Sequence, residues 1–388
     1  MTPNSILICG TGIVGLATTL AFSRQGFKPQ LLGPRKTFHD TDSQQYYPRV
    51  YALSPASQQF LHELGVWGLL NHGRVTSVRA MDIYGDARGY VGLDAWQVAK
   101  TDLAWIIESS ELERVLQQLV IAAGVTWHDD KFQSLSDGSV ISETGQRFTP
   151  KLLVGADGAQ SLVRAAAAIT TNCVPYGQSG VVTHLNAEHA HDNIARQWFS
   201  PQGIVALLPM PTTSDGPQVS LVWSMPTDKA KALLELADDS RNQRLQAELS
   251  DITGGSLGQL SVRSPVYSFP LTLQHSQMVA PGVALVGDAA HRIHPLAGQG
   301  LNLGLADAKT LAATVATRAS RSHPGSIQTL RRYRRQRAEA IFLMGFACDS
   351  LYHLFAPQVA PAVALRNIGM NVVNRLPFVK RLLIEGAS

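Results

Sequence analysis

Apolar and polar positions succeed one another along this chain in patterns that predict alternating strands and helices. The apolar run at residues 6–9 is followed by glycines and then by the apolar-periodic stretch 13–22, which predicts a strand, a turn and a helix over residues 5–26. Strand-like stretches begin at Arg49 and fill residues 75–96, with turns at Gly85 and Gly89, whereas residues 55–64 and 109–123 have helical periodicity. This succession predicts an α/β fold.

The second half of the chain repeats both patterns. Residues 174–225 contain several strand-like runs, notably 204–208 and 219–223, and residues 228–249 are expected to form one helix. Another buried strand is predicted at residues 283–286, and a helix from Gly300 to about Arg318, before a linker at residues 320–326. Because 388 residues exceed the usual size of a single core, we expect two domains.

Three glycine-containing motifs each follow an apolar run. They are Gly10-Thr11-Gly12-Ile13-Val14-Gly15, Gly155-Ala156-Asp157-Gly158 and Gly287-Asp288-Ala289-Ala290-His291. Between a strand and a helix, the glycines of the first motif allow a tight turn and the close approach of a pyrophosphate to the helix N-terminus. One such turn is common in α/β proteins, but three in this order indicate a dinucleotide site.

The order of these motifs resembles that of the flavin-dependent aromatic hydroxylases. Finer segments are similar to the UbiH, UbiI and UbiF group of ubiquinone-biosynthesis hydroxylases: residues 49–54, 64–67, 203–209, 294–300 and 366–369. The resemblance implies a Rossmann-like FAD-binding domain, an inserted β-sheet substrate domain and C-terminal helices. We expect the FAD-binding domain at residues 1–74, 97–172 and 275–335, the substrate domain at 75–96 and 173–274, and the C-terminal helical segment at 336–388.

The resemblance also implies a cofactor site. The aspartate of the third motif, Asp288, is expected to hold the flavin ribityl chain, since a carboxylate after a buried strand can accept hydrogen bonds from sugar hydroxyls. A helix beginning near Leu301 would direct its N-terminus at the negative charge of the reduced flavin. The expected cofactor-binding residues are Gly10, Gly12, Ile13, Val14, Gly15, Arg49, Asp157, Asp288, Pro295, Gly298, Gly300, Leu301 and Asn302.

The second strand departs from the pattern of dinucleotide folds. Such a strand normally ends in Asp or Glu, which binds the adenosine ribose, but here residues 30–32 lead into Gly33 and Pro34. Losing a charged hydrogen bond of this kind costs about 1.5–3 kcal/mol, so looser FAD binding is expected. Arg35 could contact the adenine or a phosphate instead, or be a solvated loop cation, and Asp40 or Asp42 could fold back.

Catalysis in such enzymes belongs largely to the flavin, so no nucleophile or metal cluster is required. A phenolic substrate would gain from a base or hydrogen-bond acceptor, for which His294 beside Pro295 is the first candidate and His184 the second. A structural role is the alternative for His294. His184, His189 and His191 have no accompanying carboxylate or cysteine cluster, which argues against a metal site.

Composition narrows the class of protein. The three cysteines, Cys9, Cys173 and Cys348, are far apart, which argues against a disulfide framework and fits a cytoplasmic protein. Of the net charge of +4, residues 331–388 contribute nine lysines and arginines against three acids. The basic run 331–337 is interpreted as a solvated helix face or as a contact for anionic lipid or an acidic partner. No stacking platform accompanies the arginines, so nucleic acid is not expected.

The C-terminus also contains apolar faces. Residues 341–355 predict an apolar helix too short to span a bilayer, interpreted as core packing or as a docking surface. Pro377 is well placed at a helix start, and Phe378, Val379, Leu382 and Leu383 beside two cations fit an interfacial helix. Peripheral attachment to the inner face of the membrane is the expected alternative to a wholly cytoplasmic location.

Taken with the resemblance, these patterns predict an FAD-dependent monooxygenase that consumes NADPH or NADH and molecular oxygen. Its expected reaction is hydroxylation of the ring of a polyprenylated phenol in ubiquinone biosynthesis, with other proteins of that pathway as possible partners. The alternatives are a flavin hydroxylase of a soluble aromatic compound and a flavin-poor scaffold subunit of a biosynthetic complex.

Overall fold

The computed structural model describes residues 5–38, 46–294, 298–355 and 359–386. A six-stranded sheet forms the core of its first part, in the order β19-β20-β12-β1-β2-β8. Its strands are β1 (Ile6–Cys9), β2 (Pro29–Leu32), β8 (Thr126–His128), β12 (Leu152–Gly155), β19 (Val279–Ala280) and β20 (Val283–Leu285). All neighbours are parallel except β19 and β20, and every residue of β1 and β12 is buried, as in a sheet covered on both faces.

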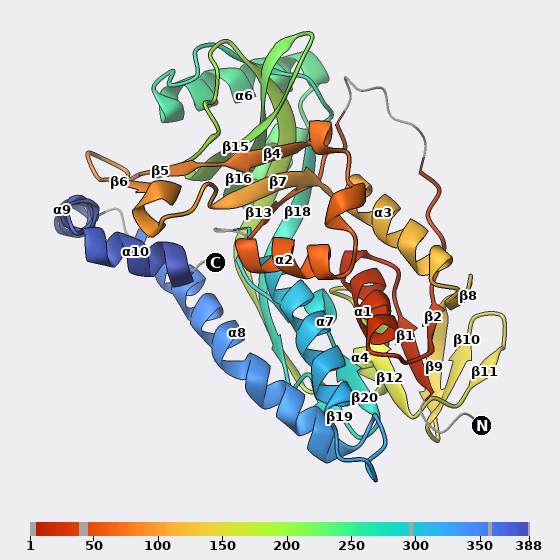
Figure 1. The fold of residues 1–388 in the computed structure, drawn as a ribbon. Helices are drawn as coiled ribbons and strands as arrows, with labels where there is room; N and C mark the ends of the chain where they lie inside the picture. The colour runs from red at the N-terminus through yellow and green to blue at the C-terminus, as the bar shows by residue number, and fades with distance from the viewer. Residues whose placement is uncertain (1–4, 39–45, 295–297, 356–358, 387–388) are drawn as a thin grey trace.

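Helices and small sheets surround this parallel sheet (Figure 1). Helix α1 (Ile13–Arg24) packs against α3 (Ser109–Ala122) and α7 (Gly300–Ala316), and α8 (Ile327–Phe355) packs against α7. Strands β9 (Phe132–Ser136), β10 (Ser139–Ser142) and β11 (Arg147–Phe148) form a small sheet beside α4 (Leu162–Ala166). The predicted strand, turn and helix over residues 5–26 are confirmed.

A larger sheet forms the second part of the molecule. Its order is β21-β18-β13-β16-β15-β14-β5-β6, with β17 paired to β13. The strands are β5 (Ala80–Tyr84), β6 (Tyr90–Asp94), β13 (Thr171–Ala187), β14 (Ile194–Ser200), β15 (Gly203–Thr213), β16 (Gly216–Pro226), β17 (Leu260–Val262), β18 (Tyr267–Ser276) and β21 (His291–Arg292). On one face, Val181, Leu221 and Trp223 belong to a buried cluster with side chains of the covering helices.

Those covering helices are α5 (Thr227–Leu234) and α6 (Asp238–Thr253), so the single helix expected at residues 228–249 is wrong. Asp238 and Asp239 occupy the first turn of α6, where acidic side chains stabilise a helix N-terminus. Local charge therefore favours a new helix start at this point. Figure 1 shows α6 over the large sheet, on the side away from the C-terminal helices.

A third sheet, in the order β3-β7-β4, joins the two parts. Its strands are β3 (Val50–Leu53), β4 (Val75–Val78) and β7 (Ala104–Glu108). Short helices connect the neighbouring segments: α2 (Pro55–Glu63), η1 (Trp67–Leu69), η2 (His72–Arg74), η3 (Ala95–Val98) and η4 (Gly287–Ala289). Residues 75–96, expected to belong wholly to the substrate domain, are thus divided: β4 pairs with β7, whereas β5 and β6 join the large sheet.

The C-terminal helices lie along the large sheet (Figure 1). Helix α8 is unbroken across the expected domain boundary at residue 336 and is followed by α9 (Ala360–Asn374) and α10 (Pro377–Gly386). Its second half packs Cys348 and Phe355 against Phe199 and Ile204. Among the described helices, none combines the length and apolar character needed to cross a membrane.

Side-chain amides of α9 bind the edge strand β6. The oxygens of Asn367, Asn371 and Asn374 accept hydrogen bonds from the backbone N–H groups of Gly89, Tyr90 and Gly92, at 2.7, 3.1 and 3.1 Å. An edge strand otherwise presents unpaired N–H groups that can recruit another chain. The asparagines therefore replace a neighbouring strand and attach α9 to the large sheet.

Candidate functional site

The turn between β1 and α1 has the geometry of a dinucleotide cradle. A side chain at Gly10 would place its Cβ 2.2 Å from the Ala156 carbonyl oxygen, and one at Gly15 would lie 2.0 Å from the Gly10 carbonyl oxygen. A Cβ at Gly12, in contrast, would meet no heavy atom within 4 Å. Gly12 is the N-cap of α1 and forms no side-chain cap, so the N-terminus of this helix is open to an anion.

The neighbouring Ile13 and Val14 have packing roles. Ile13 is buried in the core of the parallel sheet. A Cβ at Gly304 would lie only 2.8 Å from Val14 Cγ2, and Gly287, with φ of +60°, also approaches the Val14 side chain. Small residues therefore bring the N-terminus of α1, η4 and α7 close together. Three segments that are distant in sequence meet at one place.

Asp288 has the features of a ligand-binding carboxylate. It lies in η4 between the buried residues Gly287 and Ala289 but is itself partly exposed. Within the described part of the chain, its carboxylate has no hydrogen bond or ion pair, and Gln274 binds only its backbone carbonyl oxygen, at 3.2 Å. A carboxylate in this position is available to accept hydrogen bonds from sugar hydroxyls.

Asp157, the corresponding aspartate of the second motif, is occupied by its own chain. Its carboxylate accepts hydrogen bonds from Ser161 Oγ at 2.5 Å and from the Val163 N–H at 3.1 Å, which holds the start of α4. Arg164 then donates to the carbonyl oxygen of Ala289, at 2.8 Å. These bonds connect the second motif to the third, so the structure gives Asp157 a clear positioning role.

The N-terminus of α7 supplies the next part of the site. A Cβ at Gly300 would meet no heavy atom of the described residues within 4 Å, whereas one at Gly298, whose φ is +61°, would lie 3.4 Å from the Ala52 Cβ. The Asn302 side chain accepts from the Ser54 N–H at 3.0 Å and donates to the Ala52 carbonyl oxygen at 2.9 Å. It thus anchors β3 to α7, next to the largely buried Leu301. Pro295 lies outside the described residues.

A buried ion-pair network beneath this region was missed by the sequence interpretation. The Asp307 carboxylate accepts hydrogen bonds from His291 Nε2 at 2.6 Å, from Arg337 Nε at 2.7 Å and from the Gly287 N–H at 3.0 Å. Burial opposes the charge on Asp307, but His291 and Arg337 outweigh it and hold the pKa of Asp307 below its usual range. The network fixes the backbone that precedes Asp288.

The burial of Arg337 contradicts the interpretation of the whole basic run 331–337 as a solvated helix face. Its side chain is buried, as are Leu330, Tyr333 and Ile341, which share its face of α8 at helical spacing. The remaining arginines of the run, at residues 331, 332, 334 and 335, are exposed. The helical period of the buried residues was the signal that could have separated Arg337 from them.

The surroundings of Gly33, directly after β2, explain why no acidic residue stands at this position. A Cβ at Gly33 would lie 2.6 Å from Thr11 Cγ2, so the first glycine motif leaves no room for a larger side chain. The Trp127 indole donates to the Gly33 carbonyl oxygen at 2.8 Å, and the exposed Arg35 lies over the Trp127 ring at 5.2 Å. Arg35 is therefore stacked on an aromatic ring. Residues 40 and 42 lie outside the described residues.

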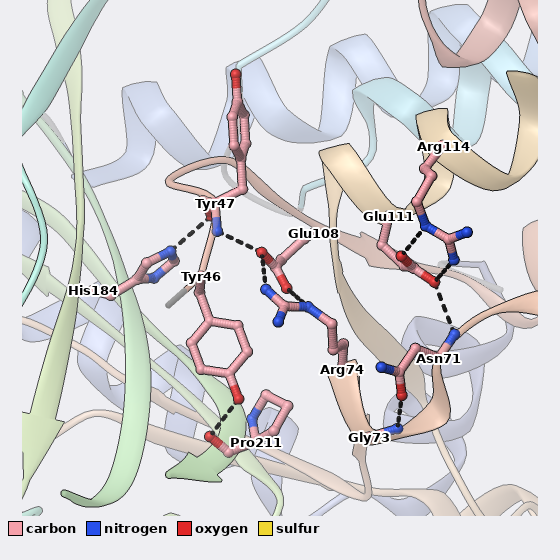
Figure 2. Close-up of polar contacts among 10 residues, drawn as sticks. All are labelled: Tyr46, Tyr47, Asn71, Gly73, Arg74, Glu108, Glu111, Arg114, His184 and Pro211. Carbon is pink, nitrogen blue, oxygen red and sulfur yellow. Dashed lines mark hydrogen bonds and ion pairs between the residues drawn. The ribbon is translucent and has the colours of Figure 1, made fainter. Parts of the chain in front are cut away.

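A polar cluster holds the chain just before Arg49 (Figure 2). The buried Glu108 carboxylate accepts from Arg74 Nε at 2.7 Å and also from the Tyr47 N–H. On the other side, His184 Nε2 lies 2.8 Å from the Tyr47 carbonyl oxygen. The Tyr47 backbone is thus held between β7 and the large sheet. Arg49 follows two residues later.

Arg49 is exposed, and its guanidinium lies 5.1 Å from the centre of the Tyr51 ring. Burial raises the pKa of Tyr51 to about 12, so its phenol remains protonated at neutral pH. Tyr51 is part of β3, the strand that Asn302 anchors to α7, and Arg49 directly precedes that strand. A positive charge is therefore presented from β3, close to the N-terminus of α7.

His294 is fully buried between two tyrosine rings. The centres of the Tyr176 and Tyr352 rings lie 4.9 and 5.6 Å from its imidazole, and Nε2 lies 3.1 Å from Gln178 Oε1. Burial lowers the pKa of His294 to about 4, so the ring is neutral near pH 7. With Nε2–H donating to the amide oxygen, Nδ1 is an acceptor, and no residue in the described part of the chain forms a hydrogen bond with it.

The face of the large sheet opposite α5 and α6 has an accessible centre. Apolar clusters cover it at both ends, one with α8 and one with β3 and β7. Between them Val182, Val222 and Ala206 are partly exposed, and they are register partners on the adjacent strands β13, β16 and β15. These three residues, here called the sheet floor, form an aliphatic surface on which a flat ring could lie.

Comparisons with known proteins agree with this geometry. Residues 4–343 match the family described as FAD binding domain. The chain is 31% identical to the 3-demethoxyubiquinol 3-hydroxylase of Escherichia coli, over 99% of this chain and 98% of that protein. It is 32% identical to the ubiquinone hydroxylase UbiL of Rhodospirillum rubrum, over 98% and 89%. Human mitochondrial ubiquinone biosynthesis monooxygenase COQ6 is 30% identical, over 100% and 93%.

Solved structures share the fold at lower identity. The p-nitrophenol 4-monooxygenase PnpA of Pseudomonas putida has a TM-score of 0.78 at 16% identity, covering 99% of this chain and 98% of that one. HpxO of Klebsiella pneumoniae, complexed with FAD and uric acid, has a TM-score of 0.74 at 17% identity, covering 99% and 97%. The α/β fold expected from the sequence is confirmed, and this chain belongs to the FAD binding domain family as a flavin-dependent aromatic monooxygenase.

Proposed function

We propose that this protein hydroxylates the ring of a polyprenylated phenol in ubiquinone biosynthesis, with FAD as cofactor and NADH or NADPH as electron donor. The observation that carries the cofactor assignment is the unpaired Asp288 carboxylate beside the open N-terminus of α1 and the N-terminus of α7. The substrate class is supported by the names of three relatives that match almost the whole chain.

The chain's residues suit distinct parts of FAD. The N–H groups of Gly12, Ile13 and Val14 would bind the pyrophosphate, and Asp288 would bind the ribityl hydroxyls. The backbone at Gly298 and Gly300 leaves space for the flat ring system, with Arg49 as a nearby cation. Asp157 and Asn302 would act through the segments they position. Bound FAD, once reduced, supplies the activation of molecular oxygen.

The ring of the substrate would lie on the sheet floor, where aliphatic side chains exclude water from the reacting face. His294 is proposed as a neutral hydrogen-bond acceptor next to the flavin loop, because its Nδ1 lacks a partner and its pKa is too low for a permanent charge. Tyr176 and Tyr352 would fix the orientation of its imidazole through ring contacts. An alternative substrate is a soluble aromatic compound, which the same floor would accept.

The apolar C-terminal surface is proposed to bring the enzyme to a prenylated substrate. Large apolar side chains of the last three helices are exposed, including Phe342, Phe346, Leu365, Phe378 and Leu382. Exposed arginines stand at residue 375, directly after α9, and at residue 381 in α10. This combination suits peripheral attachment to an anionic membrane or to another protein of the pathway.

The purified protein tests the proposal directly. We expect a yellow holoenzyme that oxidises NADH or NADPH in response to a 2-alkylphenol and converts it to a product with one additional oxygen atom. A folded but colourless protein that does not take up FAD would favour the scaffold alternative. Turnover of simple soluble phenols, together with rejection of alkylated ones, would favour the soluble substrate. A deletion strain should accumulate a prenylated quinone precursor.

A further inference from the structure

Two buried polar side chains face each other across neighbouring strands of the large sheet. His184 on β13 and Ser220 on β16 are direct register partners, so their side chains project from the same face of the sheet. Each is only 1% exposed. Directly opposed residues in an antiparallel pair have Cβ atoms about 4.5–5.5 Å apart, within reach of one shared ligand.

The hydrogen bond to Tyr47 determines the tautomer of His184. A carbonyl oxygen can only accept, so His184 Nε2, 2.8 Å from the Tyr47 oxygen, must carry the proton (Figure 2). Burial lowers the pKa of His184, and the neutral ring therefore presents Nδ1 as an acceptor. Among the described residues, this buried Nδ1 has no hydrogen-bond partner.

Ser220 is unpaired in the same way. Its Oγ is buried and has no hydrogen-bond partner within the described ranges, although a hydroxyl can both donate and accept. Buried polar groups in folded proteins normally have partners, because an unsatisfied group loses its hydration without compensation. An unsatisfied acceptor and an unsatisfied donor side by side indicate a site for a third group that can donate and accept at once.

The position of this pair relates it to the substrate. Val182 and Val222, both in the sheet floor, are the next residues of β13 and β16 on the same face, two positions from His184 and Ser220. The pair therefore borders the floor, at the end nearer Tyr46 and Tyr47. His294, with its partner Gln178, is at the other end of the same face of β13.

We propose that His184 and Ser220 bind a ring hydroxyl group of the substrate, which donates to His184 Nδ1 and accepts from Ser220 Oγ. This inference rests on the proposed function and adds a second polar contact, distinct from His294. A phenol or hydroquinone satisfies both side chains. A quinone carbonyl or a methyl ether has no proton to donate and leaves Nδ1 unpaired, so the pair selects the hydroxylated state of the ring.

The test compares 2-octylphenol with its methyl ether, in which a methyl group replaces the hydroxyl proton. Their dissociation constants are measured by the change in flavin absorbance of the holoenzyme. The parent should bind the phenol about tenfold more tightly than the ether, which corresponds to one neutral hydrogen bond. Ser220→Ala should weaken binding of the phenol and of the ether alike by several-fold, because the oxygen of either compound can accept from Ser220 Oγ, and the preference for the phenol should remain.

Ser179→Ala is the matched control. Ser179 is a buried serine of the same sheet, but it lies on β13 at a position paired with the helix-covered Met225, and its Oγ binds Thr227 Oγ1 at 3.3 Å. It should retain the parent affinity for both compounds. His184→Ala should lose the preference for the phenol, because the acceptor of the hydroxyl proton is gone, and should in addition loosen the Tyr46–Tyr47 segment, seen as faster proteolysis there.

The outcomes separate this inference from the proposed function. If Ser220→Ala keeps the parent affinity for both compounds while the enzyme still hydroxylates the phenol, Ser220 does not bind the ring oxygen and only this inference is overturned. Lower stability of Ser220→Ala with unchanged affinities would mean that Ser220 has a structural role only, and would also overturn it. A parent holoenzyme that binds neither compound overturns the proposed substrate class as well.

Discussion

At the scale of single residues, Asp157 and Asp288 show how similar sequence contexts acquire different roles. Each follows a buried parallel strand, yet only Asp157 is bound by its own chain. A carboxylate engaged by Ser161 and Val163 contributes to folding, whereas an unpaired carboxylate is available to a ligand. Both aspartates are partly exposed, so the hydrogen bonds made by the chain, rather than the motif or solvent access, separate these roles.

The two aspartates should therefore respond differently to substitution. Asp288→Ala should lower FAD affinity by about tenfold or more, through loss of charge-assisted hydrogen bonds, with little change in the stability of the FAD-free protein. Asp157→Ala should lower the free energy of unfolding by about 1–2 kcal/mol, because α4 loses its N-terminal bonds. Flavin content and urea denaturation measure the two effects. Equal FAD occupancy in Asp288→Ala and the parent would contradict the assignment.

His294 predicts a pH dependence of stability. Its pKa is lowered from 6.5 to about 4 in the folded protein, so folding favours the neutral ring. The stabilisation is present above pH 6.5 and is lost as the pH falls towards 4, by about 3 kcal/mol at the acid end. In His294→Gln this loss should be absent. Denaturation at pH 7 and pH 4 measures the difference, and equal acid sensitivity of both proteins would refute the effect.

At the scale of elements, the turn between β1 and α1 combines a packing function with a binding function. Gly10 must be small because Ala156, the residue after the neighbouring strand β12, approaches its backbone, and its φ of +118° also disfavours a side chain. Gly12 faces open space instead. The two glycines look alike in the sequence, but the contact with β12 restricts only the first.

Substitution by alanine should distinguish them. Gly12→Ala should fold normally and lose FAD, since its methyl group occupies space that the pyrophosphate needs. Gly10→Ala should lower the free energy of unfolding by roughly 2 kcal/mol or more, through backbone strain and steric overlap. Thermal denaturation and bound flavin are the measurements. Full flavin content in Gly12→Ala would show that the cofactor does not approach this turn.

At the scale of the whole molecule, the C-terminal helices connect both sheets. Helix α8 reaches Asp307 through Arg337 and the large sheet through Phe355, and α9 binds β6 through its asparagines. On α10, Ile384 is buried against Val91 and Leu93. These helices are therefore part of the folded unit, and removing residues 376–388 would also remove buried contacts. Point substitutions on the exposed face are the cleaner test.

Phe378→Ser combined with Leu382→Ser should reduce co-sedimentation with anionic liposomes by about tenfold, because two large apolar side chains leave the surface. Their exposed fractions are 76% and 60%, so folding and flavin content should not change. Leu162→Ser, an exposed leucine of α4, is the control. Residual binding should weaken with salt if the arginines contribute. Unchanged sedimentation of the double variant would exclude this face as a lipid contact.

The sequence alone determined what depends on neighbouring residues: the strands before each glycine motif, the turn at Gly12 and the helix beginning at Pro377. Such features are local, because hydrophobic period and backbone freedom act over a few residues. Tertiary structure decided the inward orientation of Arg337, the occupied carboxylate of Asp157 and the clash that excludes a side chain at Gly33. It also placed His184 opposite Ser220. Each of these depends on which distant segments meet, and that is decided by the packing of the whole core.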